Sequence, residues 1–356
     1  MSGDASAGGV SDLRIAEVAP LGVSVPPVTY GGTQRIVHFL TEELVRRGHD
    51  VTLFASGDSK TSAKLRVVRK RSLLPDINAG KVRRPDFYAV HSIGEALREA
   101  GSFDIIHCHL GPWSLPFHGL SPTPLLHTLP GLVYEDDLWM LRRYPEATVI
   151  ARSRRQVAGL DGHCPNIRVI YNGCDFEAYE FSPGPVRYLA FLGRMAWEKN
   201  PLDAIAIAGQ VGLPIVLAGE PKNEYEQDYF AEQIEPMIDG KNVIHIGEVT
   251  DAQKNELFRN AGALLFPVLV EEAFGIVMIE AMACGTPVVA YNRGAVSEVV
   301  DYGKTGFYAD AVEELPALVT RALSLDRQTV RRHARQRFNQ QRMADEYIQV
   351  YESLVK

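Results

Sequence analysis

Residues 263–292 of the chain read ALLFPVLVEEAFGIVMIEAMACGTPVVAYN. An apolar strand-type run ends at two glutamates, Gly275 then starts an apolar helix, and Gly285 ends it. A second apolar strand-type run, TPVVAYN, follows directly. Strands that are apolar along their whole length and are joined by a helix are typical of a parallel sheet covered on both faces. The stretch therefore predicts an α/β fold.

The same alternation of strand-type runs and helices continues on both sides of this stretch. A helical pattern at 33–48 ends at a glycine, and its apolar face carries Ile36, Val37, Leu40, Leu44 and Val45. The pattern restarts after FSPGPV (181–186), a Pro/Gly break suited to a linker. Strand-type runs lie at 13–20, 49–56, 103–110, 123–129, 147–153 and 167–173 before the break, and at 188–194, 213–220, 242–249, 263–270 and 286–292 after it.

The second half also contains a helix start and a helical tail. Thr250 and Gln253 have the spacing of a capping box, and the tail at 328–356 has a stripe of Met343, Tyr347, Tyr351 and Leu354. We therefore expect two Rossmann-like parallel-sheet domains that face each other across a cleft, where such folds bind ligands. The expected boundaries are 1–180, 186–335 and a C-terminal helix at 336–356.

Bulk properties exclude several classes of protein. The chain has 356 residues and a net charge of -7, whereas nucleic-acid-binding domains are usually basic. Apolar runs stop at about eight residues, well short of a membrane-spanning helix. Residues 1–12 lack a cationic start and an apolar centre, so we expect a flexible lead-in rather than a signal peptide. The four cysteines, which form no C-x-x-C pair, favour reduced thiols in the cytoplasm; they are Cys108, Cys164, Cys174 and Cys284.

Two loops have the composition of a phosphate site. Gly31 and Gly32 precede a helix, where amide groups without a neighbouring Cβ can approach an anion; a plain turn is the alternative. In AFLGRMAWEKNP a strand ends at Gly193, and Arg194 and Lys199 follow in the loop. Both cations are expected to face the cleft and bind phosphate, unless they are ordinary solvated surface residues.

The opening stretch adds two carboxylates to this site. Glu272 lies in the loop before the Gly275 helix, and Glu280 lies about a turn and a half inside it. Between them the free amides of residues 274–276 point into the cleft. Amides suit a phosphate and carboxylates accept hydrogen bonds from sugar hydroxyls, so the set suits a nucleotide sugar, which has hydroxyls on both sides of its diphosphate.

The motifs resemble those of the retaining glycosyltransferases of family 4, which have the GT-B fold. EAFGIVMIEAMACGTPVVA resembles the family's E-x7-E block, and FLGRMAWEKNP resembles G-R-x-x-x-x-K. YGGTQRIVHFLTEELVRRGHDVTLFASGDS, FDIIHCHL and VIYNGCDFEAY are similar to further family segments, so the likeness covers nearly the whole chain. It implies transfer of a hexose from a nucleotide diphosphate sugar, with UDP favoured, to an acceptor hydroxyl.

The resemblance also implies roles for residues. Arg194 and Lys199 bind the diphosphate and stabilise the leaving group, and Glu272 lies beside the donor hexose. Glu280 accepts from the ribose, and the C-terminal helix packs back on the first domain. The other expected donor-binding residues are Gly31, Gly32, Gly193, Glu248, Val249, Phe274, Gly275, Ile276 and Val277. No metal or other cofactor is expected, because no D-x-D motif occupies a plausible cleft position.

Two positions depart from the family pattern. Ala273 replaces the usual proline after the first glutamate, and Pro130 replaces a histidine that usually faces the donor sugar. His109 and His127 are candidate substitutes for that sugar contact, although a histidine in a strand is more often structural.

Other features leave alternatives open. A GT-B nucleotide-sugar epimerase and a catalytically silent sugar-nucleotide or glycan-binding protein remain rival interpretations. The basic residues of 64–85 form either a solvated connecting segment or an acceptor or membrane-surface patch, which would make the protein peripheral at the membrane. Candidate stacking faces for an acceptor are Tyr30, Trp113, Tyr134 and Trp139. Neither the acceptor nor the hexose can be deduced.

Overall fold

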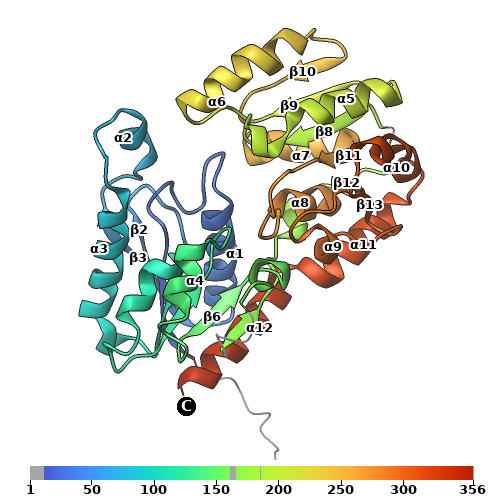
Figure 1. The fold of residues 1–356 in the computed structure, drawn as a ribbon. Coiled ribbons are helices and arrows are strands. Elements are labelled where there is room, and N and C mark those ends of the chain that lie inside the picture. The colour runs from blue at the N-terminus through green and yellow to red at the C-terminus, as the bar shows by residue number, and fades with distance from the viewer. Residues whose placement is uncertain (1–11, 161–165, 185, 356) are drawn as a thin grey trace, which may run out of the picture.

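The structure, a computed structural model, describes residues 12–160, 166–184 and 186–355. Two parallel sheets form two lobes, and the last helix returns from the second lobe to the first (Figure 1). The expected α/β architecture of two Rossmann-like sheets is confirmed. Three expectations depend partly on residues outside the described ones. They concern the leading segment (1–11), one of the thiols (Cys164) and the linker (Pro185).

The first lobe is built on a seven-stranded sheet of order β3-β2-β1-β4-β5-β6-β7. Its inner strands β4, β5 and β6 are buried along their whole length, which explains their continuous apolar sequences. The strands are β1 (Arg14–Val18), β2 (Asp50–Ser56), β3 (Lys64–Arg69), β4 (Ile105–Cys108), β5 (Leu125–Thr128), β6 (Thr148–Ala151) and β7 (Ile167–Val169).

The edge strand β3 was not expected. Its sequence, KLRVVR, begins the basic stretch that the sequence analysis treated as a connecting segment or a surface patch. Charged residues are common on edge strands because they discourage pairing with another chain. The charges of Lys64, Arg66 and Arg69 therefore made the strand read as part of a basic surface segment.

Among the described residues of the first lobe, the α-helices are α1 (Gly32–Arg46), α2 (Leu74–Asn78), α3 (Pro85–Arg98) and α4 (Glu135–Leu141). The helix expected at 33–48 is confirmed as α1. Its apolar face, including Ile36, Leu40 and Leu44, is buried against β1 and β2 in the core of the lobe.

The second lobe has a six-stranded sheet of order β10-β9-β8-β11-β12-β13. Its strands are β8 (Tyr188–Leu192), β9 (Ile215–Ala218), β10 (Val243–His245), β11 (Ala261–Phe266), β12 (Val288–Tyr291) and β13 (Gly306–Ala309). Its helices are α5 (Pro201–Val211), α6 (Glu224–Tyr229), α7 (Asp251–Asn260), α8 (Ile276–Ala283), α9 (Val296–Val299) and α10 (Leu315–Ala322). Strand β13, at the edge of the sheet beside β12, was not expected.

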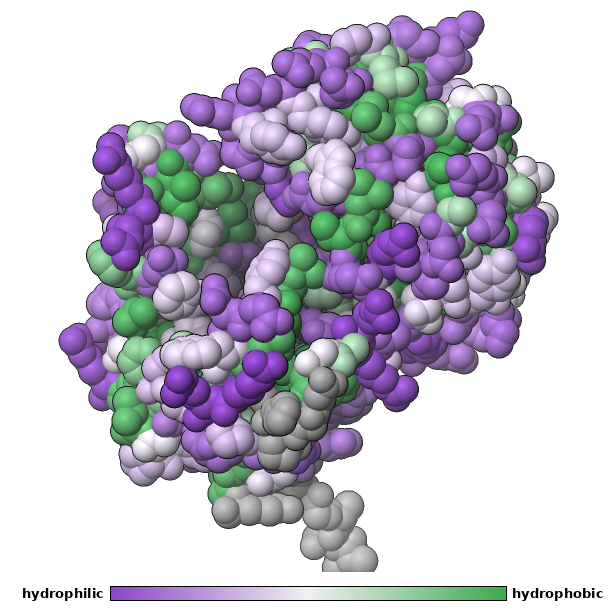
Figure 2. Space-filling model, viewed as in Figure 1, coloured by the Kyte–Doolittle hydropathy of each residue, from purple (hydrophilic) through white to green (hydrophobic). Residues whose placement is uncertain are grey.

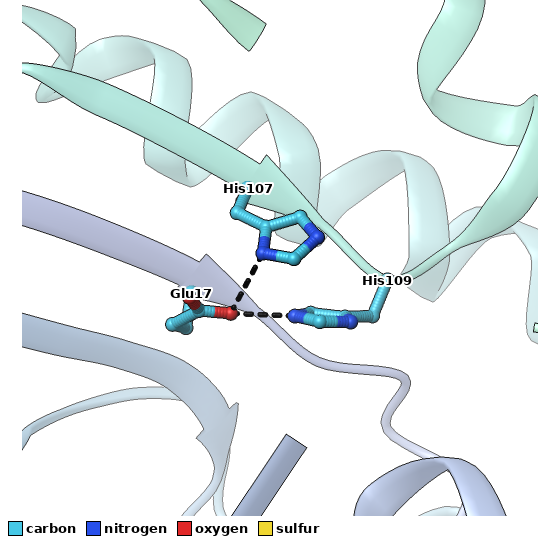
Figure 3. A group of neighbouring side chains, drawn as sticks. All are labelled: Glu17, His107 and His109. Atoms are coloured by element: carbon cyan, nitrogen blue, oxygen red, sulfur yellow. Dashed lines mark hydrogen bonds and ion pairs between the residues drawn. The ribbon is translucent and has the colours of Figure 1, made fainter. Parts of the chain in front are cut away.

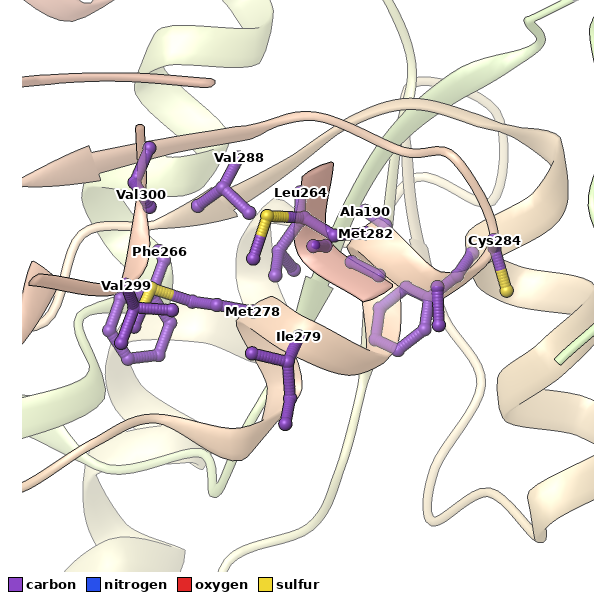
Figure 4. Close-up of a cluster of buried hydrophobic side chains, with 14 of the residues drawn as sticks. Ala190, Leu264, Phe266, Met278, Ile279, Met282, Cys284, Val288, Val299 and Val300 are labelled. Carbon is purple, nitrogen blue, oxygen red and sulfur yellow. The ribbon is translucent and has the colours of Figure 1, made fainter. Parts of the chain in front are cut away.

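Helix α8 is the buried helix that the opening stretch predicts. Met278, Ile279 and Met282 pack on Leu264 of β11 and Val288 of β12 (Figure 4). The capping box at the start of α7 is also confirmed, because the Thr250 and Gln253 side chains bond reciprocally to the backbone.

The tail is helical, as expected, but it forms two helices. Helix α11 (Arg327–Phe338) stays on the second lobe, Asn339 is extended, and α12 (Gln340–Val355) crosses to the first lobe (Figure 1). Met343, Tyr347 and Tyr351 are fully buried there. No helix within the described residues is both long and apolar enough to cross a lipid bilayer.

The strand orders position the site. In each sheet the order reverses once, between β1 and β4 in the first and between β8 and β11 in the second. Ligands of open α/β sheets bind beyond the carboxyl ends of the strands at such a point. The loops that follow β1, β8 and β11 are therefore the expected walls of a site.

Candidate active site

A cleft between the lobes contains a first chamber of about 220 Å³. The hollow separates the two lobes on the face shown in Figure 2. It is formed by the loops after β1, β8 and β11 and by α8. Predicted residues on its wall are Gly31, Gly32, Gly193, Arg194, Lys199, Glu248, Val249, Glu272, Gly275, Ile276, Val277 and Glu280.

A second chamber of about 510 Å³ adjoins the first, with which it shares Arg194, Lys199, Glu272 and the start of α8. This volume lies within the range of ligand pockets, roughly 300–1,000 Å³. Its other walls come mostly from the first lobe and include Pro130, Leu132, Tyr134, Arg152 and Asn172. Phe274, the remaining predicted donor contact, also lines this chamber.

The loop after β8 brings both predicted cations to the cleft, where each is paired with a carboxylate. Arg194 pairs with Glu198 and with the buried Glu226, and Lys199 pairs with Glu272. Burial lowers the pKa of Arg194, but Glu226, Tyr30 and Glu198 together outweigh it, so that the guanidinium pKa is raised. Any anion that binds here competes with these carboxylates.

The start of α8 presents free backbone amides to the cavity. Gly275 is the N-cap with φ 76°, a left-handed conformation that favours glycine, and no side chain caps the helix. A Cβ at this position would lie 2.7 Å from the Met278 Cε. The first amides of a helix have no intrahelical acceptor, and the helix dipole favours an anion beside them.

Glu280 is almost fully buried among partners that the sequence analysis missed. Its Oε1 accepts from Lys254 Nζ at 2.5 Å and from the Tyr179 hydroxyl at 2.8 Å, and it lies 3.7 Å from Arg35 Nε. Burial, followed by the charge of Glu280, raises the pKa of Tyr179 well above its usual value. Two features of the sequence could have indicated these partners. Lys254 lies in the helix with the predicted capping box, and Arg35 follows the Gly31-Gly32 pair.

Contacts across the cleft tie the two lobes together. Thr29 donates its hydroxyl to Glu248 at 2.8 Å, and Arg35 forms an ion pair with Asp251 at 2.8 Å. Glu248 is also paired with Lys222, another cavity residue that the sequence analysis missed. The glycine-rich loop and the start of α1 in the first lobe thus lie directly against residues 248–251 of the second lobe.

His109 does not line either chamber. It is fully buried, with Nε2 2.5 Å from Glu17 Oε2, and His107 approaches the same oxygen at 3.4 Å (Figure 3). The Tyr351 hydroxyl donates to the other oxygen of Glu17 at 2.9 Å. Burial opposes ionisation of Glu17, but the two histidines outweigh it and lower its pKa to about 2.

The donor atoms of Glu17, His107 and His109 all lie within 4.8 Å of one another, as in a metal site. The contacts that the structure records for them are hydrogen bonds inside the core, and they join the first sheet to α12. This arrangement explains why a charged strand residue is buried at position 17.

His127 is also buried rather than exposed to the cleft. Its Nδ1 lies 2.7 Å from the Ser114 hydroxyl and its Nε2 lies 3.2 Å from His118 Nδ1. Burial and then His118 lower its pKa to about 3. In contrast, Pro130, two residues after β5, lines the second chamber.

Among the aromatic candidates, Tyr30 and Tyr134 line the second chamber, and Trp113 and Trp139 do not. Trp197, which the sequence analysis did not single out, also lines it and is half exposed.

Comparisons with known proteins agree with this architecture. Residues 177–341 match the family "Glycosyl transferases group 1", and residues 30–178 match "Glycosyltransferase Family 4". The phosphatidyl-myo-inositol mannosyltransferase of Mycobacterium leprae is 28% identical, over 96% of this chain and 97% of its own length. AviGT4, a glycosyltransferase involved in avilamycin A biosynthesis, is 27% identical with a TM-score of 0.72, over 96% of this chain and 98% of its own.

HepE of Anabaena, solved in complex with UDP-glucose, shares the fold with a TM-score of 0.74 at 21% identity, over 96% of this chain and 100% of its own. The two family matches run from residue 30 to residue 341, and the two similar solved glycosyltransferases each cover 96% of the chain. The chain therefore belongs to the glycosyltransferases of family 4.

Proposed function

We propose that the protein is a retaining glycosyltransferase that moves a hexose from a nucleotide diphosphate sugar to an acceptor hydroxyl, with UDP as the favoured nucleotide. One observation carries the proposal: Arg194, Lys199 and the start of α8 line one cavity, with Glu272 and Glu280 on its wall. Cations and free amides suit the diphosphate, and the carboxylates suit sugar hydroxyls on either side of it.

The roles of the donor-binding residues follow from where these groups lie on the cavity wall. Glu280 accepts from the ribose through Oε2, since Oε1 already contacts Lys254, Tyr179 and Arg35. The segment at Glu248 and Val249 holds the nucleobase through backbone atoms. Glycines 31, 32 and 193 let backbone groups come close to the phosphates.

Binding of the donor rearranges ion pairs. Lys199 is bonded to Glu272 in the structure, and both are assigned to the donor. When the diphosphate takes Lys199, the Glu272 carboxylate is released to accept from hexose hydroxyls. These ion pairs thus neutralise the charges of the site until the ligand replaces each partner.

Catalysis in this proposal is electrostatic. As the bond to the hexose breaks, negative charge grows on the β-phosphate, where Arg194, Lys199 and the α8 amides stabilise it. The acceptor attacks from the same face, and the leaving phosphate helps to remove its proton. No protein nucleophile and no metal ion is required, so we expect turnover to continue in EDTA; strict dependence on a divalent cation would contradict this mechanism.

Substitution of the two cations tests the proposal. Arg194→Ala and Lys199→Ala should each lower turnover by on the order of 10² to 10³, because each removes one donor to the developing charge. Turnover is measured as UDP released from UDP-sugars, with the exposed Lys241→Ala as the matched control. Normal unfolding temperatures with unchanged turnover in either variant would contradict the assigned roles.

The family match favours transfer over the two rival interpretations. An epimerase would convert the donor alone into a second nucleotide sugar, and a silent binding protein would leave it intact. Incubation with the donor alone therefore identifies an epimerase, and UDP released by slow transfer to water separates the transferase from the silent binding protein.

The acceptor enters through the second chamber, where Tyr134 and Trp197 provide exposed aromatic faces. The names of the two relatives assign them to unlike reactions, mannosyl transfer to phosphatidyl-myo-inositol and the biosynthesis of avilamycin A. Their acceptors therefore do not transfer to this chain, and a glycan, a small molecule or a lipid-linked sugar fits the same chemistry.

Contact with a membrane surface is an additional proposal for the 64–85 stretch. Arg66 and Arg69 pair with Glu99 and Asp76. Five further cations of the stretch are exposed, and Arg84 among them lies over the exposed Phe87 ring; the five are Lys70, Arg71, Lys81, Arg83 and Arg84. Anionic liposomes should sediment the wild-type protein and fail to sediment a variant with these five charges reversed. Equal sedimentation of both would identify the stretch as a solvated segment.

A further inference from the structure

Arg152 is a buried arginine, and two of its guanidinium nitrogens lack a hydrogen-bond partner among the described residues. It directly follows β6, is 5% exposed, and among the described residues its Nε and Nη2 have no acceptor. Burial lowers its pKa, with Tyr347 and Glu272 acting in the opposite direction. A buried guanidinium without partners is costly, so such groups normally have an anion or several carbonyls around them.

Arg327 shows how this fold satisfies a buried arginine that serves only the structure. Its Nε donates to Ser182 O at 2.7 Å, its Nη1 donates to Ala261 O at 2.6 Å, and its Nη2 donates to the Thr286 hydroxyl at 2.8 Å. Arg152 has no such set of acceptors within the described part of the chain, although both residues are buried.

The position of Arg152 indicates where its partner comes from. The side chain lines the second chamber beside Pro130 and Asn172, at the carboxyl end of the first sheet. Glu272, the nearby carboxylate, is already held by Lys199. The chamber meets the first chamber at Lys199 and Gly275, so a group bound beside Arg152 lies beyond the diphosphate, on the side of the sugars.

We propose that Arg152 binds an anionic group, a carboxylate or a phosphate, carried by one of the two sugar substrates. The planar guanidinium can donate two parallel hydrogen bonds to either group. The anion is either the carboxylate of a hexuronic acid donor or a charged substituent of the acceptor. This inference rests on the proposed function and narrows its substrate class.

The donor arm of the test compares UDP, UDP-glucose and UDP-glucuronate by titration calorimetry. Wild-type protein should bind UDP-glucuronate about ten-fold or more tightly than UDP-glucose if the donor carries the charge. Arg152→Met should abolish that preference and leave the affinity for UDP unchanged. Arg168→Met, an exposed arginine on the neighbouring strand β7, should keep it.

The acceptor arm uses glucose 6-phosphate and glucuronate with the UDP complex. Either compound should raise the unfolding temperature of the wild-type complex, compared with glucose, if the acceptor carries the charge. Arg152→Met should lose this increase.

The proposal is overturned if wild-type protein prefers the charged compound in neither arm, or if Arg152→Met weakens UDP itself, which would place the guanidinium at the diphosphate. The comparison of charged and uncharged ligands on wild-type protein tests the proposal even if the variant does not fold. Absence of any nucleotide binding to wild-type protein would instead refute the proposed function.

Discussion

At the scale of single residues, the charged side chains of the site form ion pairs with one another. Lys199 holds Glu272, Arg194 holds Glu226, and Lys254 holds Glu280. The sequence predicted the members that lie in motifs, because their spacing from glycines and strand ends is regular. It did not predict Glu226 or Lys254, because these partners come from other helices and meet the motif residues only in the folded chain.

The buried histidines should make stability depend on pH. His127 has a pKa of about 3 in the folded protein, against the usual 6.5, so the unfolded chain binds a proton that the folded chain rejects. Its stabilising effect is complete above pH 6.5 and is lost as the pH falls toward 3. His127→Gln should therefore reduce the loss of unfolding free energy between pH 7 and pH 4.5 by about 1 kcal/mol or more.

Urea unfolding at the two pH values measures this difference, with the exposed His91→Gln as the control. Since burial and His107 lower the pKa of His109 to about 4, part of the pH dependence should remain. An unchanged pH dependence in the His127 variant would show that its burial does not disfavour the proton.

At the scale of elements, the strongest sequence signals were local. Gly275 marked the start of α8 and the capping box marked the start of α7, since both depend only on neighbouring residues. The edge strand β3 and the break at Asn339 were not predictable in this way. The first depends on pairing with β2, and the second depends on a bridge between Asn339 and Cys174.

Gly275→Ala tests the start of α8. Because φ is 76° and the new methyl group would lie 2.7 Å from Met278 Cε, the variant should lose more than about 1 kcal/mol of unfolding free energy. It should also bind UDP more weakly, because the displaced amides face the cavity. Gly209→Ala, inside α5 with no atom within 4 Å of the new Cβ, should gain about 0.5–1 kcal/mol.

Denaturant unfolding and UDP titration of the two variants give both quantities. Equal stability of Gly275→Ala and the wild type would mean that the left-handed turn is not required.

At the scale of the whole molecule, the alternation of strands and helices was sufficient to predict two parallel sheets and a cleft. It could not predict that Tyr351 of α12 completes a buried hydrogen-bond network with Glu17 and His107 of the first lobe. Tyr351 and Glu17 are 334 residues apart in the sequence, and only their hydrogen bond reveals the contact. Likewise, only the structure shows that two guanidinium nitrogens of Arg152 lack an acceptor among the described residues.

Removal of one hydroxyl tests the connection made by α12. Tyr351→Phe removes the hydroxyl that contacts Glu17 Oε1 and His107 Nδ1 inside the core, and it should lower the unfolding free energy by about 1–3 kcal/mol. Tyr225→Phe, which alters a mostly exposed ring, should be neutral. Chemical denaturation of both variants provides the comparison, and equal stability would mean that the network does not hold α12 in place.

The most direct test of the central claim is to follow a nucleotide sugar by proton NMR in the presence of the enzyme without acceptor. Slow transfer to water should release UDP and a hexose that first appears in the anomeric configuration of the donor, and Lys199→Ala should abolish the signal. Release of the opposite anomer would contradict a retaining mechanism. A complete panel of nucleotide sugars left intact, or converted only to an epimer, would contradict transferase activity itself.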